Sequence, residues 1–159
     1  MTNASDVVGA LTRRGWTLGV AESLTGGAVA AELVRVPGAS AALWGAVVAY
    51  ATPVKHSLLG VDEALLAAHG PVHPRVALQM ADGVRRAVGV GRPADVGIAT
   101  TGIAGPDSPD GQPVGTVHVA VVTPECSVSE SFRFDGDRAE IRSSAVDAVL
   151  SLLRRLTRE

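Results

Sequence analysis

Two patterns of apolar residues alternate along the chain. Short, nearly continuous apolar runs are typical of buried strands, and segments with apolar residues every three or four positions are typical of amphipathic helices. The runs predict strands over 17–21, 44–51, 95–101, 114–122 and 127–134. The periodic segments predict helices over 5–14, 27–36, 53–59, 62–68, 74–88 and 137–156.

This order of elements predicts an α/β fold, a three-layer α-β-α sandwich with a mixed sheet of about five strands. The run over 44–51 is apolar almost throughout, which indicates a strand buried on both faces. Only a short turn at 123–125 separates the last two strands, so they should form an antiparallel hairpin. No linker or internal repeat interrupts the pattern, and we expect one domain over 1–159.

Amino-acid composition limits the classes of protein to which this chain can belong. Apolar residues make up 47% of the chain but aromatic residues only 3%, so small side chains must build the core, and we expect self-association into a dimer or trimer. The net charge of −2, without a basic stripe, argues against nucleic acid as a partner. The single cysteine, Cys126, excludes an internal disulfide and a cysteine-rich zinc site. We expect a cytoplasmic protein, because no long uncharged apolar stretch or signal-peptide pattern is present.

Ser23 stands where the first predicted strand meets a helix. Glu22 and Ser23 end the apolar run, and Gly26-Gly27 open the helical segment. A helix N-terminus offers backbone N–H groups and a positive dipole end, which suit a bound anion or an oxygen that becomes negative during a reaction. The alternative is that Ser23 simply caps the helix. Neither a Gly-x-Ser-x-Gly nor a Ser-x-x-Lys pattern surrounds it.

Lys55 is the candidate base for Ser23. It is the one lysine beside thirteen arginines, and it follows the second strand as Ser23 follows the first. If these strands are neighbours, both side chains lie at the same edge of the sheet. Burial would lower the lysine pKa and allow the neutral amine to accept a proton. The alternative is an ordinary surface lysine. The four histidines match no metal motif and are expected at the surface.

Four further residues carry candidate chemistry. Glu22 could pair with Lys55 or Arg142, orient neighbouring backbone, or contribute to binding the substrate. Thr101 ends the third strand and could relay a proton or donate to a phosphate, and the following Gly102–Gly105 loop lacks the Walker pattern of nucleoside triphosphatases. Arg138 and Arg142 share a helix face, as either a phosphate-binding pair or solvated surface.

Five motifs, in order, resemble the CinA C-terminal domain family, and the resemblance extends from about residue 7 to residue 156. The motifs are Ala21-Glu22-Ser23-Leu24-Thr25-Gly26-Gly27, Val48-Ala49-Tyr50 with Lys55 and Leu58-Leu59-Gly60-Val61, Gly70-Pro71-Val72, Thr101-Gly102-Ile103-Ala104-Gly105-Pro106, and Pro113-Val114-Gly115-Thr116-Val117. The chain is most similar to the stand-alone nicotinamide-nucleotide amidases of this family.

The resemblance implies hydrolysis of the carboxamide of nicotinamide mononucleotide to nicotinate mononucleotide and ammonia, in pyridine nucleotide recycling. It implies a serine nucleophile, a lysine base and no metal or other cofactor. By motif, Ser23 is the nucleophile and Lys55 the base. Thr101, the hydroxyl residue before the glycine loop, is expected to assist catalysis, and Tyr50, the tyrosine of the second motif, to bind the substrate.

We expect the oxyanion on the N–H groups of Thr25, Gly26 or Gly27. We expect the substrate phosphate on the Gly102–Gly105 loop, on Arg142 or on a neighbouring subunit. Residues 50–55 read Tyr-Ala-Thr-Pro-Val-Lys where Tyr-Ser-Asn-Glu-x-Lys is common in the family. This difference leaves a non-catalytic nucleotide-binding module as the alternative function.

Overall fold

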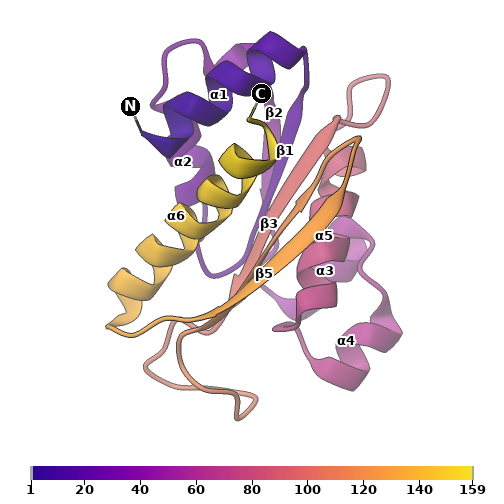
Figure 1. The fold of residues 1–159 in the computed structure, drawn as a ribbon. Helices are drawn as coiled ribbons and strands as arrows, with labels where there is room; N and C mark the ends of the chain where they lie inside the picture. Colours follow the sequence, from indigo (N-terminus) through magenta and orange to yellow (C-terminus); the bar gives the residue numbers. More distant parts are fainter. Residues whose placement is uncertain (1, 159) are drawn as a thin grey trace.

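A single five-stranded sheet lies between two layers of helices in the computed structural model, which describes residues 2–158 (Figure 1). In spatial order the strands are β2 (Leu43–Val48), β1 (Leu18–Glu22), β3 (Val96–Gly102), β4 (Thr116–Val122) and β5 (Ser127–Arg133). The first three are parallel to one another, and β4 and β5 run antiparallel as a hairpin. The predicted α/β fold with a mixed sheet is confirmed, as is the terminal hairpin.

Each face of the sheet carries its own helices and its own core (Figure 1). One face is covered by α1 (Asn3–Arg14), α2 (Ala28–Val34) and α6 (Arg138–Leu156). The other is covered by α3 (Thr52–Leu59), α4 (Glu63–His69) and α5 (Pro74–Ala87). A short 3-10 helix, η1 (Ala39–Ala41), precedes β2. None of the helices within residues 2–158 is long and apolar enough to cross a bilayer.

The connections that follow β1 and β2 pass over opposite faces of the sheet. The connection from β1 to β2 runs through α2, and the connection from β2 to β3 passes over the other face through α3, α4 and α5. The strand order therefore reverses beside β1, between β1 and β3. In open α/β sheets this reversal point is where ligands bind.

Two helices begin at an aspartate whose side chain caps the first turn. Asp62 accepts a hydrogen bond from the Ala64 N–H at the start of α4. Asp137 forms a reciprocal capping box with Glu140 at the start of α6. Each cap satisfies backbone N–H groups that a helix start leaves unpaired, so both elements are fixed locally.

The prediction that residues 44–51 form a strand buried on both faces is wrong. β2 spans Leu43–Val48 at the edge of the sheet, pairs only with β1, and has no fully buried residue. Val48 is 46% exposed, and Tyr50 just beyond it is 62% exposed. An apolar run has the same sequence pattern in a central strand and in an edge strand, so the pattern alone does not predict the strand's position in the sheet.

Gly97 fixes how closely α5 approaches the sheet. A Cβ at Gly97 would lie 1.7 Å from the Ala81 carbonyl oxygen of α5, a separation that no side chain tolerates. Only glycine lets the helix backbone pack directly onto β3 at this point.

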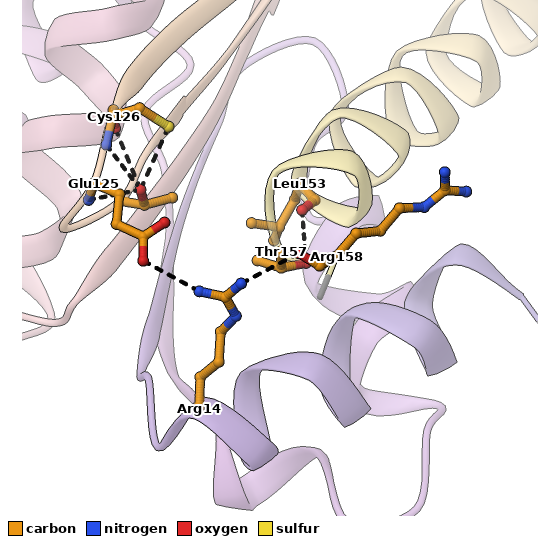
Figure 2. A network of polar contacts seen from close by, with 7 residues as sticks. Arg14, Glu125, Cys126, Leu153, Thr157 and Arg158 are labelled. Atoms are coloured by element: carbon orange, nitrogen blue, oxygen red, sulfur yellow. Dashed lines mark hydrogen bonds and ion pairs between the residues drawn. The ribbon is translucent and has the colours of Figure 1, made fainter.

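A polar network joins three segments of the chain (Figure 2). It includes the turn after β4, which lies beside the start of β3 and so opposite the carboxyl ends of the parallel strands. Arg14, the last residue of α1, donates to the Glu125 carboxylate (3.4 Å) and to the Arg158 carbonyl (3.3 Å). Thr157 donates to the Leu153 carbonyl, and the Thr123 hydroxyl accepts from the N–H groups of Glu125 and Cys126. The network thus ties α1, the β4–β5 turn and the end of α6 together.

Candidate active site

A cavity of about 330 Å³ opens where β1 and β3 end. Seven of the candidate residues named from the sequence line it, namely Ser23, Tyr50, Lys55, Thr101, Gly102, Gly105 and Arg138. The remaining lining residues are Leu24, Thr52, Pro71, Val72, Ile103, Ala104, Asp107, Pro109 and Asp110. Motifs spread over more than a hundred positions therefore meet in one place, because the three parallel strands end at the same edge.

Ser23 and Lys55 are in direct contact. Lys55 Nζ lies 3.0 Å from Ser23 Oγ, and both residues are buried, with exposed fractions of 1% for Lys55 and 8% for Ser23. Ser23 directly follows β1, and Lys55 lies on the first turns of α3, just after β2. The contact is a consequence of the side-by-side, parallel pairing of β1 and β2.

Burial makes the Lys55 ammonium easier to deprotonate than an exposed one. Burial lowers the pKa of the Lys55 ammonium from 10.5 to about 8. Besides Ser23, Nζ contacts the Ala49 carbonyl oxygen at 2.8 Å and the Tyr50 carbonyl oxygen at 3.2 Å. A neutral amine has two N–H donors and one lone pair. As an ammonium, Nζ donates to all three oxygens. Once it is deprotonated, its two N–H groups can stay on the carbonyls, and the lone pair is then available to the Ser23 hydroxyl.

Thr101 reaches the cavity from the end of β3. Its hydroxyl donates to the Pro71 carbonyl at 2.7 Å, and the residue is 1% exposed. The oxygen retains acceptor capacity toward the cavity. Its neighbour Thr100 points to the other face, where its hydroxyl lies 2.8 Å from the Thr25 hydroxyl and accepts weakly from the Ser23 N–H at 3.4 Å.

The interpretation of Ser23 as a helix cap is wrong. Gly27 is the N-cap of α2, without any side-chain cap bond, and both Gly26 and Gly27 have positive φ values, which glycine adopts readily. Glu22 satisfies the helix start instead. Its fully buried carboxylate accepts from the Val29 N–H at 2.9 Å and from the Ala30 N–H at 3.1 Å. Of the alternatives left open for Glu22, orienting neighbouring backbone is the one observed.

The segment after Ser23 does not line the cavity beyond Leu24. Thr25 is fully buried, and the Gly26 N–H donates to the Ser23 carbonyl at 3.1 Å. Of the residues from Glu22 to Gly27, only Ser23 and Leu24 line the cavity.

Arg138 and Arg142 have different surroundings although they share a helix face. Arg142 donates to the carbonyls of Leu24 and Thr25, at 2.8 and 3.1 Å, and does not line the cavity. Arg138 lines it, donating to the Gly105 carbonyl at 2.7 Å and to the Tyr50 hydroxyl at 3.3 Å. Their spacing in the sequence presents Arg138 and Arg142 only as a pair. In the structure, Arg138 is the first residue of α6 and reaches the cavity, whereas Arg142 lies one turn further along.

The histidines lie outside the cavity lining. His56 and His69 are exposed, as expected, but His118 is buried, and its Nδ1 lies 2.7 Å from the Ser131 hydroxyl. Burial, with a smaller effect from nearby His73, lowers the pKa of His118. Within the described part of the chain, no group of three or more His, Cys, Asp or Glu side chains is arranged to hold a metal ion.

The fold and the cavity define a three-layer α/β protein with a buried serine–lysine pair at the sheet's reversal point. The family model of the CinA C-terminal domain matches residues 1–157, and the chain belongs to this family.

A CinA-like protein of Frankia casuarinae is 52% identical over 150 residues, which cover 94% of this chain and 34% of that protein. A putative competence-damage inducible protein of Desulforamulus reducens is 45% identical over 140 residues, covering 88% of this chain and 33% of that protein. The chain thus spans about a third of the length of these curated relatives.

Solved structures show the same fold. The CinA superfamily protein of Klebsiella pneumoniae 700603 superimposes with a TM-score of 0.90 at 33% identity, over 98% of this chain and 95% of that one. The competence/damage inducible protein of Agrobacterium tumefaciens gives a TM-score of 0.89 at 34% identity, over 98% and 94% of the two chains.

Proposed function

We propose that this protein is an amidohydrolase that converts nicotinamide mononucleotide to nicotinate mononucleotide and ammonia, with Ser23 as nucleophile and Lys55 as general base. The observation that carries the proposal is the 3.0 Å contact between Lys55 Nζ and Ser23 Oγ beside the cavity. A serine is a weak nucleophile by itself, and a base within hydrogen-bond distance is what activates it.

The lowered pKa of Lys55 supports its assignment as the base. With a pKa of about 8, about one tenth of the molecules hold the neutral amine at pH 7. An unperturbed lysine would be neutral in fewer than about one molecule in a thousand at that pH. Burial therefore supplies a proton acceptor that no histidine provides in this cavity.

The reaction proceeds in two halves. Ser23 Oγ bonds to the carboxamide carbon while its proton passes to Lys55. The protonated lysine, with Thr101 nearby, returns that proton to the leaving nitrogen, and ammonia departs as the C–N bond breaks. Water, deprotonated in turn by Lys55, attacks the acyl-enzyme, and the nicotinate carboxylate leaves as the Ser23 hydroxyl is restored.

We expect the Leu24 N–H to stabilise the oxyanion. The Gly26 N–H is already donated to the Ser23 carbonyl, and Thr25, Gly26 and Gly27 are not among the residues that line the cavity, so we do not retain them as donors. The Leu24 N–H comes directly after the nucleophile, on a residue that lines the cavity. An N–H in this position serves the same purpose in other serine hydrolases.

Arg138 and the Gly102–Gly105 loop are our candidates for the substrate phosphate. Arg138 is the only arginine among the residues that line the cavity, and its guanidinium already lies on the Gly105 carbonyl. A planar guanidinium suits phosphate oxygens geometrically. We retain the expectation of a homo-oligomer, a dimer or trimer, in which a neighbouring subunit could complete this phosphate site.

Ammonia release from nicotinamide mononucleotide tests the proposal. Wild type, Ser23→Ala and Lys55→Arg are compared, with Ser40→Ala, an exposed serine outside the cavity, as the matched control. We expect Ser23→Ala to lose activity by roughly 10³-fold or more. Lys55→Arg should lose a similar amount because arginine keeps the charge but cannot act as a base.

The outcomes are distinct. Undiminished turnover in Ser23→Ala or in Lys55→Arg would refute the mechanism. Calorimetric binding of the mononucleotide by the wild type without product over hours would instead indicate the non-catalytic nucleotide-binding module.

A further inference from the structure

The segment from Ser23 to Gly27 is flexible by composition but anchored by its neighbours. Two consecutive glycines with positive φ lie within four residues of the serine, and Gly26 is exposed. Glycine loses more conformational freedom on ordering than any other residue. A nucleophile on such a segment keeps its geometry only if surrounding groups hold the backbone.

Arg142 supplies one of these anchors from a distant part of the sequence. Its Nε donates to the Leu24 carbonyl at 2.8 Å, and one terminal nitrogen donates to the Thr25 carbonyl at 3.1 Å. Among the described residues no other group donates to the Leu24 carbonyl, whereas the Thr25 carbonyl also accepts from the Ala28 N–H. The orientation of the Leu24–Thr25 peptide thus depends on a helix that begins more than a hundred residues later.

The planarity of the peptide bond carries this effect back to the serine. In a trans peptide the C=O and the following N–H point in opposite directions, so fixing one fixes the other. The Ser23 carbonyl is held by the Gly26 N–H, and the next two carbonyls are held by Arg142. Three successive peptide planes after the nucleophile are fixed together, and with them the direction of Ser23 Cβ and of the Leu24 N–H.

We propose that Arg142 is a positioning residue, which acts on catalysis only by holding the backbone that carries Ser23 and does not touch the substrate. This inference rests on the proposed function for its substrate. It replaces our expectation that Arg142 binds the substrate phosphate. A displacement of the nucleophile by about 1 Å costs roughly 100-fold in rate, so the expected effect is large for a side chain outside the cavity.

Steady-state kinetics separate positioning from phosphate binding. In Arg142→Ala we expect kcat for nicotinamide mononucleotide to fall by roughly 10- to 100-fold while KM changes less than about threefold. In Arg142→Lys the loss should be smaller, because an ammonium can reach one of the two carbonyls. Arg155→Ala, on the same helix and paired with Glu130 at the surface, is the matched control and should change neither constant.

Guanidinium ion provides a readout that a general loss of stability would not give. Added at low millimolar concentration it can enter the space left in Arg142→Ala, donate to the same two carbonyls and restore part of kcat. It should not raise kcat in the wild type or in Arg155→Ala. Thermal unfolding of each variant is measured alongside to confirm that the comparison is between folded proteins.

A fluorophosphonate keeps the inference testable without the proposed substrate. Ser23 Oγ forms a bond to phosphorus, fluoride leaves, and the serine proton passes to Lys55. The labelling rate should fall in Arg142→Ala by a factor similar to that in kcat and should recover with guanidinium. If the wild type is labelled but releases no ammonia from the mononucleotide, the proposed function fails, and the labelling rates alone decide the inference.

Two results would overturn the positioning role. A rise in KM of tenfold or more with unchanged kcat would make Arg142 a substrate ligand. Turnover and labelling within twofold of the wild type in Arg142→Ala would show that the other anchors suffice.

Discussion

Replacing Lys55 by methionine should change the pH dependence of stability in a way set by its burial. The folded chain holds the Lys55 ammonium with a pKa of about 8, against 10.5 when unfolded. Below pH 8 both states carry the proton, and the folded state bears the full cost of a buried charge. Between these two pKa values the folded amine is neutral while the unfolded amine stays charged, so the stability of the wild type rises with pH.

The magnitude is set by the same two pKa values. Each pKa unit corresponds to about 1.36 kcal/mol, so the drop from 10.5 to about 8 amounts to about 3 kcal/mol. Lys55→Met removes this cost at pH 7 but leaves the Ala49 and Tyr50 carbonyls without their donor, at about 1 kcal/mol each. We therefore expect the variant to be more stable than the wild type by about 1 kcal/mol at pH 7.

Urea unfolding followed by circular dichroism, at pH steps from 7 to 10.5, measures this difference. The wild type should gain about 3 kcal/mol relative to Lys55→Met across that range. Lys55→Arg is the control, because its guanidinium stays charged throughout and should show no such gain. Parallel stability curves for the wild type and Lys55→Met would refute the idea that Lys55 is buried as a charge at neutral pH.

Three other predictions concern different parts of the molecule. For the amidase reaction, kcat/KM should rise about tenfold per pH unit below pH 7 and level off above an apparent pKa of about 8, because Lys55 then loses its proton. A flat profile from pH 6 to 9 would exclude Lys55 as the base. Glu22→Ala should lower the free energy of unfolding by roughly 2–4 kcal/mol, because it removes two charge-assisted hydrogen bonds to the start of α2, and a loss below about 0.5 kcal/mol in urea titrations would contradict this. Gly97→Ala should destabilise the fold by roughly 2 kcal/mol or more by forcing α5 off β3, whereas Gly9→Ala in α1 should stabilise it by about 0.5–1 kcal/mol. Equal melting temperatures for the two variants would argue against the close approach of α5 to β3.

The meeting of Ser23 and Lys55 was predictable because it depends on local signals. Each residue comes soon after an apolar run, and parallel neighbouring strands bring the residues at their carboxyl ends to one edge of the sheet. The adjacency of β1 and β2, on which the prediction was conditional, is not encoded in either run. Strand order depends on how whole helices pack, and no single run of residues records it.

The roles of Glu22, Arg138 and Arg142 depended on longer-range geometry. Glu22 looks like a partner for a cation, yet its carboxylate turns back onto α2, seven residues away in the chain. Arg138 and Arg142 share a helix face, and one helical turn decides which of them reaches the loop after β3. Such differences of about 5 Å lie below what helical periodicity can resolve.

The chain's single lysine is almost completely enclosed, with 1% of its surface exposed. A protease that cuts only after lysine therefore has one site in the whole chain, and that site is closed in the native state. The rate of this single cleavage measures how often the loop and helix around the cavity open, because cutting at residue 55 requires the segment to leave its place. Cleavage after Lys55 therefore reports local opening of the region around the cavity without any introduced label.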